Sequence, residues 1–153
     1  MNTSLLKLNK KLICVTIGDI EGIGIHLLLK EFKRDKIKDF ILITNINIFN
    51  KYLKFPKKNI NILKEKNTNK YIEKKLNIYN YKTKDKYTNT IDSLKYAYEF
   101  TKKEFFAGIL TLPLNKFKII KFVNKKFIDQ TTYFSNREDK KYNYLIFYYK
   151  KKF

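Results

Sequence analysis

Three of the four glycines in this chain of 153 residues lie within seven positions, at Gly18, Gly22 and Gly24. The apolar run from Leu12 to Ile17 before them predicts a buried strand, and Ile25 to about Arg34 has the spacing of a helix. Glycine permits close approach to the backbone, and the first turn of a helix carries free N–H groups and partial positive charge. Such strand-to-helix turns often hold phosphates or carboxylates.

The three glycines and Asp19 are therefore candidate contacts for an anionic ligand or substrate. Their spacing, G-x-x-x-G-x-G, is neither the dinucleotide fingerprint G-x-G-x-x-G nor a P-loop. Taken alone, the pattern is equally compatible with a tight turn that binds nothing.

A second candidate is the segment Pro-Leu-Asn-Lys, which ends in Asn115 and Lys116 and follows an apolar run at 107–112. Proteins with parallel sheets place ligands at the carboxyl ends of their strands. A lysine there could pair with a phosphate or carboxylate, or it could be one more surface lysine.

The composition is strongly basic, with a net charge of +20. Basic surfaces bind nucleic acids, so a small nucleic-acid-binding protein is the alternative function. Only Arg34 and Arg137 are arginines, and the lysines are spread almost evenly, whereas nucleic-acid recognition favours a clustered basic face and arginine. The excess of Lys, Asn, Ile, Phe and Tyr matches A/T-rich codons, and this bias accounts for most of the charge. A steep salt dependence of saturable binding would favour the alternative.

Cys14 is the single cysteine, which excludes a disulfide framework and a C-x-x-C pair. It lies in the first apolar run, where we expect a buried thiol. No apolar run reaches membrane-spanning length, and residues 1–11 lack the apolar region of a signal peptide. We therefore expect a cytoplasmic protein with no membrane partner.

Short apolar runs alternate with longer helical patterns, which predicts an α/β fold with a mostly parallel sheet flanked by helices, in a single unit over residues 1–153. Strands are expected at 12–17, 39–44, 59–63, 76–79, 107–112 and 144–149, and helices at 25–34, 46–54 and 90–104, the last capped by Thr90 or Asp92. The apolar run 144–149 ends close to Phe153, so we expect either an edge strand or the front portion of a longer protein.

Three segments, in order, resemble the 4-hydroxythreonine-4-phosphate dehydrogenase family of pyridoxal phosphate (pyridoxine) biosynthesis. Residues 16–24, TIGDIEGIG, are similar to the family's T-x-G-D-P-A-G-I-G-P-E. Residues 107–116, AGILTLPLNK, resemble D-A-[IL]-V-T-A-P-[IL]-N-K, and residues 127–134, FIDQTTYF, resemble F-x-G-H-T-E-[YF]-[LF]. The segment SLKYA at 93–97 precedes the second motif. The resemblance covers essentially this whole chain, but only the front part of a family member.

The resemblance implies a fold like that of isocitrate and isopropylmalate dehydrogenases, incomplete at the C-terminus. It implies oxidation of a phosphorylated hydroxy-amino acid by NAD or NADP, followed by decarboxylation, with a divalent metal held by three histidines. Family members are dimers with sites at the subunit interface. The family's His-Thr pair contacts the substrate, so Thr131 is carried over as a substrate-binding residue and Gln130 as the occupant of a changed position.

The departures from the family bear on activity. Glu21 stands where the family has Ala, Asp129 where it has Gly, and Gln130 where it has His. The single histidine, His26, matches no metal ligand, and we expect it to be an ordinary residue at the surface or at the boundary of the core. We therefore expect a truncated dehydrogenase that is inactive alone, either a decaying gene product or one half of an enzyme completed by another chain. A third possibility is a phosphate-binding α/β domain of another family, built on the same glycine turn.

Overall fold

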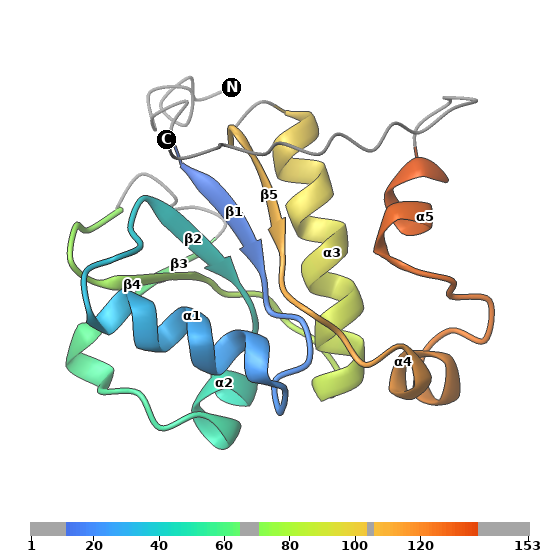
Figure 1. Ribbon diagram of the computed structural model, residues 1–153, viewed down its shortest axis with the longest axis horizontal. Coiled ribbons are helices and arrows are strands. Elements are labelled where there is room, and N and C mark those ends of the chain that lie inside the picture. Colours follow the sequence, from blue (N-terminus) through green and yellow to red (C-terminus); the bar gives the residue numbers. More distant parts are fainter. Residues whose placement is uncertain (1–11, 65–70, 104–105, 138–153) are drawn as a thin grey trace, which may run out of the picture.

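The central strands form from short, largely apolar runs, because helices cover both faces of that part of the sheet. The computed structural model describes residues 12–64, 71–103 and 106–137 (Figure 1). Its strands are β1 (Ile13–Thr16), β2 (Phe40–Ile43), β3 (Ile60–Leu63), β4 (Leu76–Tyr79) and β5 (Gly108–Thr111). They pair in parallel in the order β3-β4-β2-β1-β5, which confirms the predicted α/β fold.

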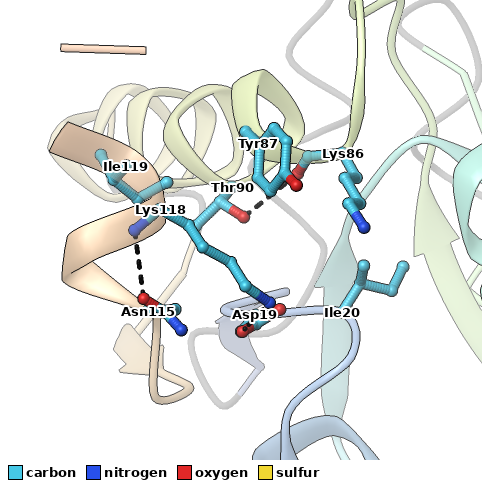
Figure 2. A pocket seen from close by; sticks show the side chains of 8 residues that line it. All are labelled: Asp19, Ile20, Lys86, Tyr87, Thr90, Asn115, Lys118 and Ile119. Atoms are coloured by element: carbon cyan, nitrogen blue, oxygen red, sulfur yellow. Dashed lines mark hydrogen bonds and ion pairs between the residues drawn. The ribbon is translucent and has the colours of Figure 1, made fainter. Parts of the chain in front are cut away.

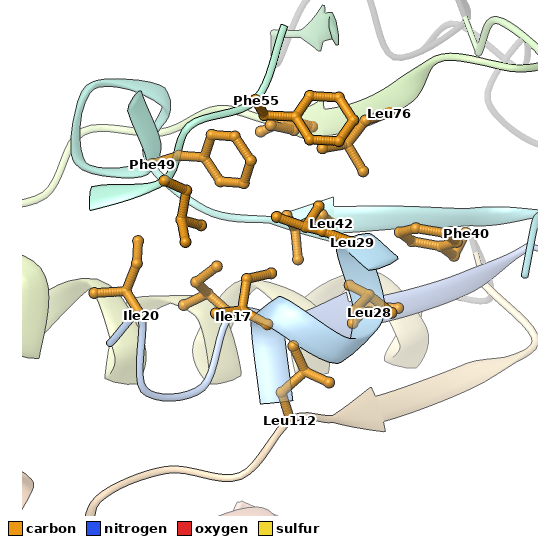
Figure 3. Close-up of a cluster of buried hydrophobic side chains, with 14 residues drawn as sticks. Ile17, Ile20, Leu28, Leu29, Phe40, Leu42, Phe49, Phe55, Leu76 and Leu112 are labelled. Carbon is orange, nitrogen blue, oxygen red and sulfur yellow. The ribbon is translucent and has the colours of Figure 1, made fainter. Parts of the chain in front are cut away.

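Helices α1 (Ile23–Lys33) and α2 (Ile46–Tyr52) cover one face of the sheet, and α3 (Lys86–Lys102) covers the other. Alternate residues of β2 point to the two sides: Leu42 packs with Leu28 of α1 and Phe49 of α2 (Figure 3), whereas Ile41 packs on the α3 side. A short 3-10 helix, η2 (Lys57–Asn59), precedes β3. Two short helices, α4 (Lys116–Phe122) and α5 (Gln130–Ser135), form an outer layer against α3 (Figure 1).

The strand order creates a switch point beside β1. The chain leaves β1 through α1 toward β2, but it returns from β4 through α3 to place β5 on the opposite side of β1. The segments that follow β1 and β5 therefore lead to opposite faces of the sheet, α1 on one and α4 on the other. In open α/β sheets, the crevice at such carboxyl ends is where ligands bind. The glycine turn and the Pro113 turn meet at this point.

Several sequence predictions of element boundaries are wrong. Helix α3 begins four residues earlier than expected, because Asp85, and not Thr90 or Asp92, caps it by accepting hydrogen bonds from the N–H groups of Tyr87 and Thr88. Thr90 instead lies buried inside the helix. Helices α4 and α5 were not predicted. The predicted strand at 144–149 lies outside the described residues.

Candidate functional site

The turn after β1 is locked against the turn after β5. Gly18 has φ +62°, and a Cβ atom at this position would lie 2.4 Å from the carbonyl oxygen of Pro113. The N–H of Asp19 donates to that same oxygen at 2.9 Å. A Cβ at Gly24 would lie 2.7 Å from the ring Cδ of Pro113. Two of the three clustered glycines are therefore required by this close approach, whatever else the turn does.

The backbone polar groups of the glycine turn are hydrogen-bonded both within the turn and to neighbouring segments. The N–H of Glu21 donates to Asp19 Oδ1 at 3.1 Å, and the N–H of Gly22 donates to the Asp19 carbonyl at 2.9 Å. The carbonyl of Gly18 accepts from the Thr90 hydroxyl of α3 at 2.8 Å. The structure thus engages the N–H groups of residues 19, 21 and 22 internally. Anion binding by the turn's backbone stays a prediction.

Charged side chains of three elements converge over this turn. Lys118 of α4 places its Nζ 3.3 Å from Asp19 Oδ2 and 3.4 Å from Glu21 Oε2 (Figure 2 shows Lys118 reaching across to Asp19). Lys86, in the first turn of α3, places its Nζ 2.7 Å from the same Glu21 oxygen. The hydrogen bond between Lys86 and Glu21 is the main cause of both pKa shifts: it lowers the pKa of Glu21 and raises the pKa of Lys86. The Asp19 carboxylate is the main cause that raises the pKa of Lys118.

A small pocket lies beside these ion pairs (Figure 2). Its space is about 10 Å³, close to the minimum that a single water requires. The residues around it come from the glycine turn, α3, and the turn and helix that follow β5: Asp19, Ile20, Lys86, Tyr87, Thr90, Asn115, Lys118 and Ile119. As it stands, the pocket is too small for a substrate.

Asn115 and Lys116, both predicted as contacts for an anionic ligand, have different surroundings in the structure. Asn115 caps α4, because its side-chain oxygen accepts from the N–H of Lys118 at 3.1 Å. It also lines the pocket. Lys116 is exposed at the start of α4, and its charge contributes to lowering the pKa of Asp129, although the hydrogen bond from the N–H of Thr132 is the largest cause.

The third resembling segment, residues 127–134, contacts the end of β5 through one side chain. Gln130 Nε2 donates to the carbonyl of Leu112, just before Pro113, at 3.0 Å. Asp129 caps α5 by accepting from the N–H of Thr132 at 2.7 Å, and this hydrogen bond fixes the start of the helix. Thr131 is exposed in the first turn of α5. All three segments that carry the family resemblance are thus linked through residues 112 and 113.

The described residues do not fit a metal centre. Within 12–64, 71–103 and 106–137, no group of three His, Cys, Asp or Glu side chains could hold an ion. His26 is exposed on α1, as predicted. Cys14 is buried, also as predicted, and its burial raises the pKa of its thiol. Among the described helices, none is long and apolar enough to cross a membrane.

The fold defines the class of this protein as an α/β protein with an open parallel sheet. Beyond that class, no known family model matches the chain, and no curated protein matches it significantly.

Sequence reasoning missed the most prominent side chains of the site, Glu21, Lys86 and Lys118, as well as Thr90. Glu21 is separated from Lys86 by 65 positions and from Lys118 by 97. In a chain with 34 basic residues, no local pattern distinguishes these two lysines from the others. Only the position of Glu21, where the resembled family has Ala, offered a signal.

Proposed function

We propose that this chain is a dehydrogenase-type protein of pyridoxal phosphate synthesis that supplies part of the site for a phosphorylated hydroxy-amino acid. The observation that supports the proposal is the meeting of the three resembling segments at the carboxyl ends of β1 and β5. Gly18 and Gly24 contact Pro113, and Gln130 donates to Leu112. The first two segments follow neighbouring parallel strands and meet for that reason, so the third segment, which Gln130 joins to Leu112, carries most of this support.

The exposed groups at this edge suit such a substrate chemically. Lys116 and Thr131 offer an ammonium and a hydroxyl group, both exposed near the end of β5. An ammonium and a hydroxyl can donate to phosphate or carboxylate oxygens. Gln130 can still hold a neutral hydrogen bond at the family's His position, but it cannot change charge near neutral pH as His can.

For the residues that the structure describes, the proposed activity is binding of the substrate and not its oxidation. Because the described residues do not form a metal site, we derive no step through a metal or a nicotinamide. NAD or NADP and a divalent metal would have to be held by other residues or by a complementing chain. We expect the purified chain alone to give no reduction of NAD or NADP with the phosphorylated hydroxythreonine.

Calorimetric titration with the phosphorylated hydroxythreonine tests the proposal. We expect saturable binding that Thr131→Ala and Lys116→Ala each weaken by roughly tenfold, about the effect of losing one hydrogen bond to a charged group. Lys57→Ala is the matched control, because Lys57 is also an exposed lysine and lies in η2, before β3 at the opposite edge of the sheet. Equal weakening by Lys57→Ala, or binding no stronger than that of unphosphorylated hydroxythreonine, would refute the proposal.

A further inference from the structure

One carboxylate oxygen of Glu21 bridges two ammonium groups from different helices. Glu21 Oε2 lies 2.7 Å from Lys86 Nζ and 3.4 Å from Lys118 Nζ. Because both nitrogens contact the same oxygen, the two positive charges are held close together. Two ammonium groups held around a single oxygen resemble the surroundings of a bound anion, with the Glu21 carboxylate in the place of a ligand.

The Lys86 side chain is positioned before any ligand arrives. Its Nζ lies 4.9 Å from the ring centre of Tyr52 in α2 and 5.1 Å from that of Tyr87 in α3, at cation–π distance from both. The Tyr87 ring in turn stacks on Phe122 of α4 at 4.5 Å, and α4 carries Lys118. These aromatic contacts link the helix that carries Lys86 to the helix that carries Lys118.

The two acidic groups of the cluster differ in how firmly they are held. Asp19 is 18% exposed, and its other oxygen accepts from the backbone of Glu21, so it belongs to the turn. Glu21 is 40% exposed, and within the described part of the chain its carboxylate is held by the two lysines. Exposed ion pairs of this kind are weak. Glu21 is therefore the group that a stronger anion would displace.

We propose that Lys86 and Lys118 form a binding site for the phosphate of a phosphate monoester, and that Glu21 occupies this site as an internal counter-ion until the phosphate displaces it. A phosphate monoester carries about −1.5 to −2 charge at neutral pH, against −1 for the carboxylate, and it offers three acceptor oxygens. Lys86 and Lys118 also line the adjoining pocket, which has room for about one water.

This inference rests on the proposed function for the identity of the ligand, but not for the site itself. Lys86 and Lys118 are not among the residues that carry the family resemblance. The Glu21 carboxylate stands where the resembled family has Ala. We therefore expect the Glu21 carboxylate to compete with phosphate for the two lysines in this chain.

The test is a titration with inorganic phosphate, followed by the phosphorylated hydroxythreonine, of the full chain and its variants. Glu21→Gln and Glu21→Ala should each tighten phosphate binding by roughly five- to tenfold, because the competing charge is gone. Lys86→Met and Lys118→Met should each weaken it at least tenfold, and Lys57→Met should leave it unchanged. The far-UV circular dichroism of each variant confirms that it is folded.

Unchanged or weaker phosphate binding in both folded Glu21 variants would overturn the inference, as would equal weakening by Lys57→Met. The outcome is separable from that of the proposed function. If both Glu21 variants tighten phosphate binding but the phosphorylated hydroxythreonine binds no better than phosphate, the lysine site stands and the proposed substrate is wrong. If that substrate binds well and neither Glu21 variant changes its affinity or that of phosphate, the proposed function stands and this inference fails.

Discussion

Gly18 and Pro113 approach each other so closely that no side chain fits between them: a Cβ on Gly18 would lie 2.4 Å from the Pro113 carbonyl oxygen. The two residues follow β1 and β5, the strands on either side of the switch point. This contact joins the first and second resembling segments into one site. It also makes the glycine turn necessary for the architecture, independently of any ligand.

Gly18→Ala should destabilise the protein by about 3 kcal/mol, because it combines a left-handed backbone conformation with a clash against backbone. Gly108→Ala is the matched control: a Cβ there meets nothing within 4 Å, so we expect unchanged stability or a small gain. Urea unfolding monitored by circular dichroism measures both. Equal midpoints for the two variants would contradict the contact between the turns.

Ser93 joins the ends of two strands to α3. Its hydroxyl accepts from the N–H of Ile17 at 2.9 Å and donates to the carbonyl of Ile43 at 2.9 Å, and its side chain is fully buried. Ser93→Ala leaves two backbone groups without this partner and should cost about 2 kcal/mol of unfolding free energy.

Ser135→Ala serves as the control for Ser93. The Ser135 hydroxyl bonds within the last turn of α5 and is only partly buried, so we expect a change within about 0.5 kcal/mol. Denaturant unfolding of both variants, side by side, gives the comparison. A Ser93→Ala variant as stable as Ser135→Ala would show that the bridge contributes nothing.

The cap of α5 should depend on pH. The hydrogen bond from the N–H of Thr132 is the main cause that lowers the pKa of Asp129 below its ordinary value of 3.8. A lowered pKa in the folded state contributes stability that is present above the unfolded value and is lost as pH falls through the folded value. The stability difference between wild type and Asp129→Ala should therefore be full at pH 7 and shrink below pH 3.8.

Asp129→Asn separates the cap from the charge, because asparagine caps helices about as well as aspartate. This variant should lose less stability than Asp129→Ala at pH 7, and its difference from Asp129→Ala should not shrink in acid. Unfolding midpoints at pH 7 and pH 3 supply the data. A wild-type advantage over Asp129→Ala that is constant from pH 7 to pH 3 would rule out this role of Asp129.

Most of the sheet could be predicted from sequence because its strands are short and largely apolar runs. Segments such as Phe40–Ile43 are apolar throughout, as a strand covered on both faces requires. The small outer helices could not be predicted, because α4 spans only seven residues and α5 only six, and Phe117 and Phe122 of α4 stay exposed. The start of α3 was missed because Asp85 precedes polar residues, where helical periodicity is weak.

Within the site, the glycine turn and Asn115 were recognisable because tight turns and helix caps favour particular residue types at fixed local positions. The pairs between Glu21 and its two lysines were not, since they depend on how α3 and α4 pack beside the turn that follows β1. A long-range ion pair has no period and no fixed spacing. Gln130 was placed by resemblance, and its contact with Leu112 appears only in three dimensions.

A titration of ¹⁵N-labelled protein with the phosphorylated hydroxythreonine, followed by amide chemical shifts, tests the central claim most directly. We predict that the backbone amides of residues 18–24, 112, 114–118 and 130–131 shift together with one dissociation constant, while those of η2 stay unchanged. Shifts scattered over lysine-rich surfaces without saturation, or shifts in only one of the three segments, would contradict a shared substrate site at the carboxyl ends of β1 and β5.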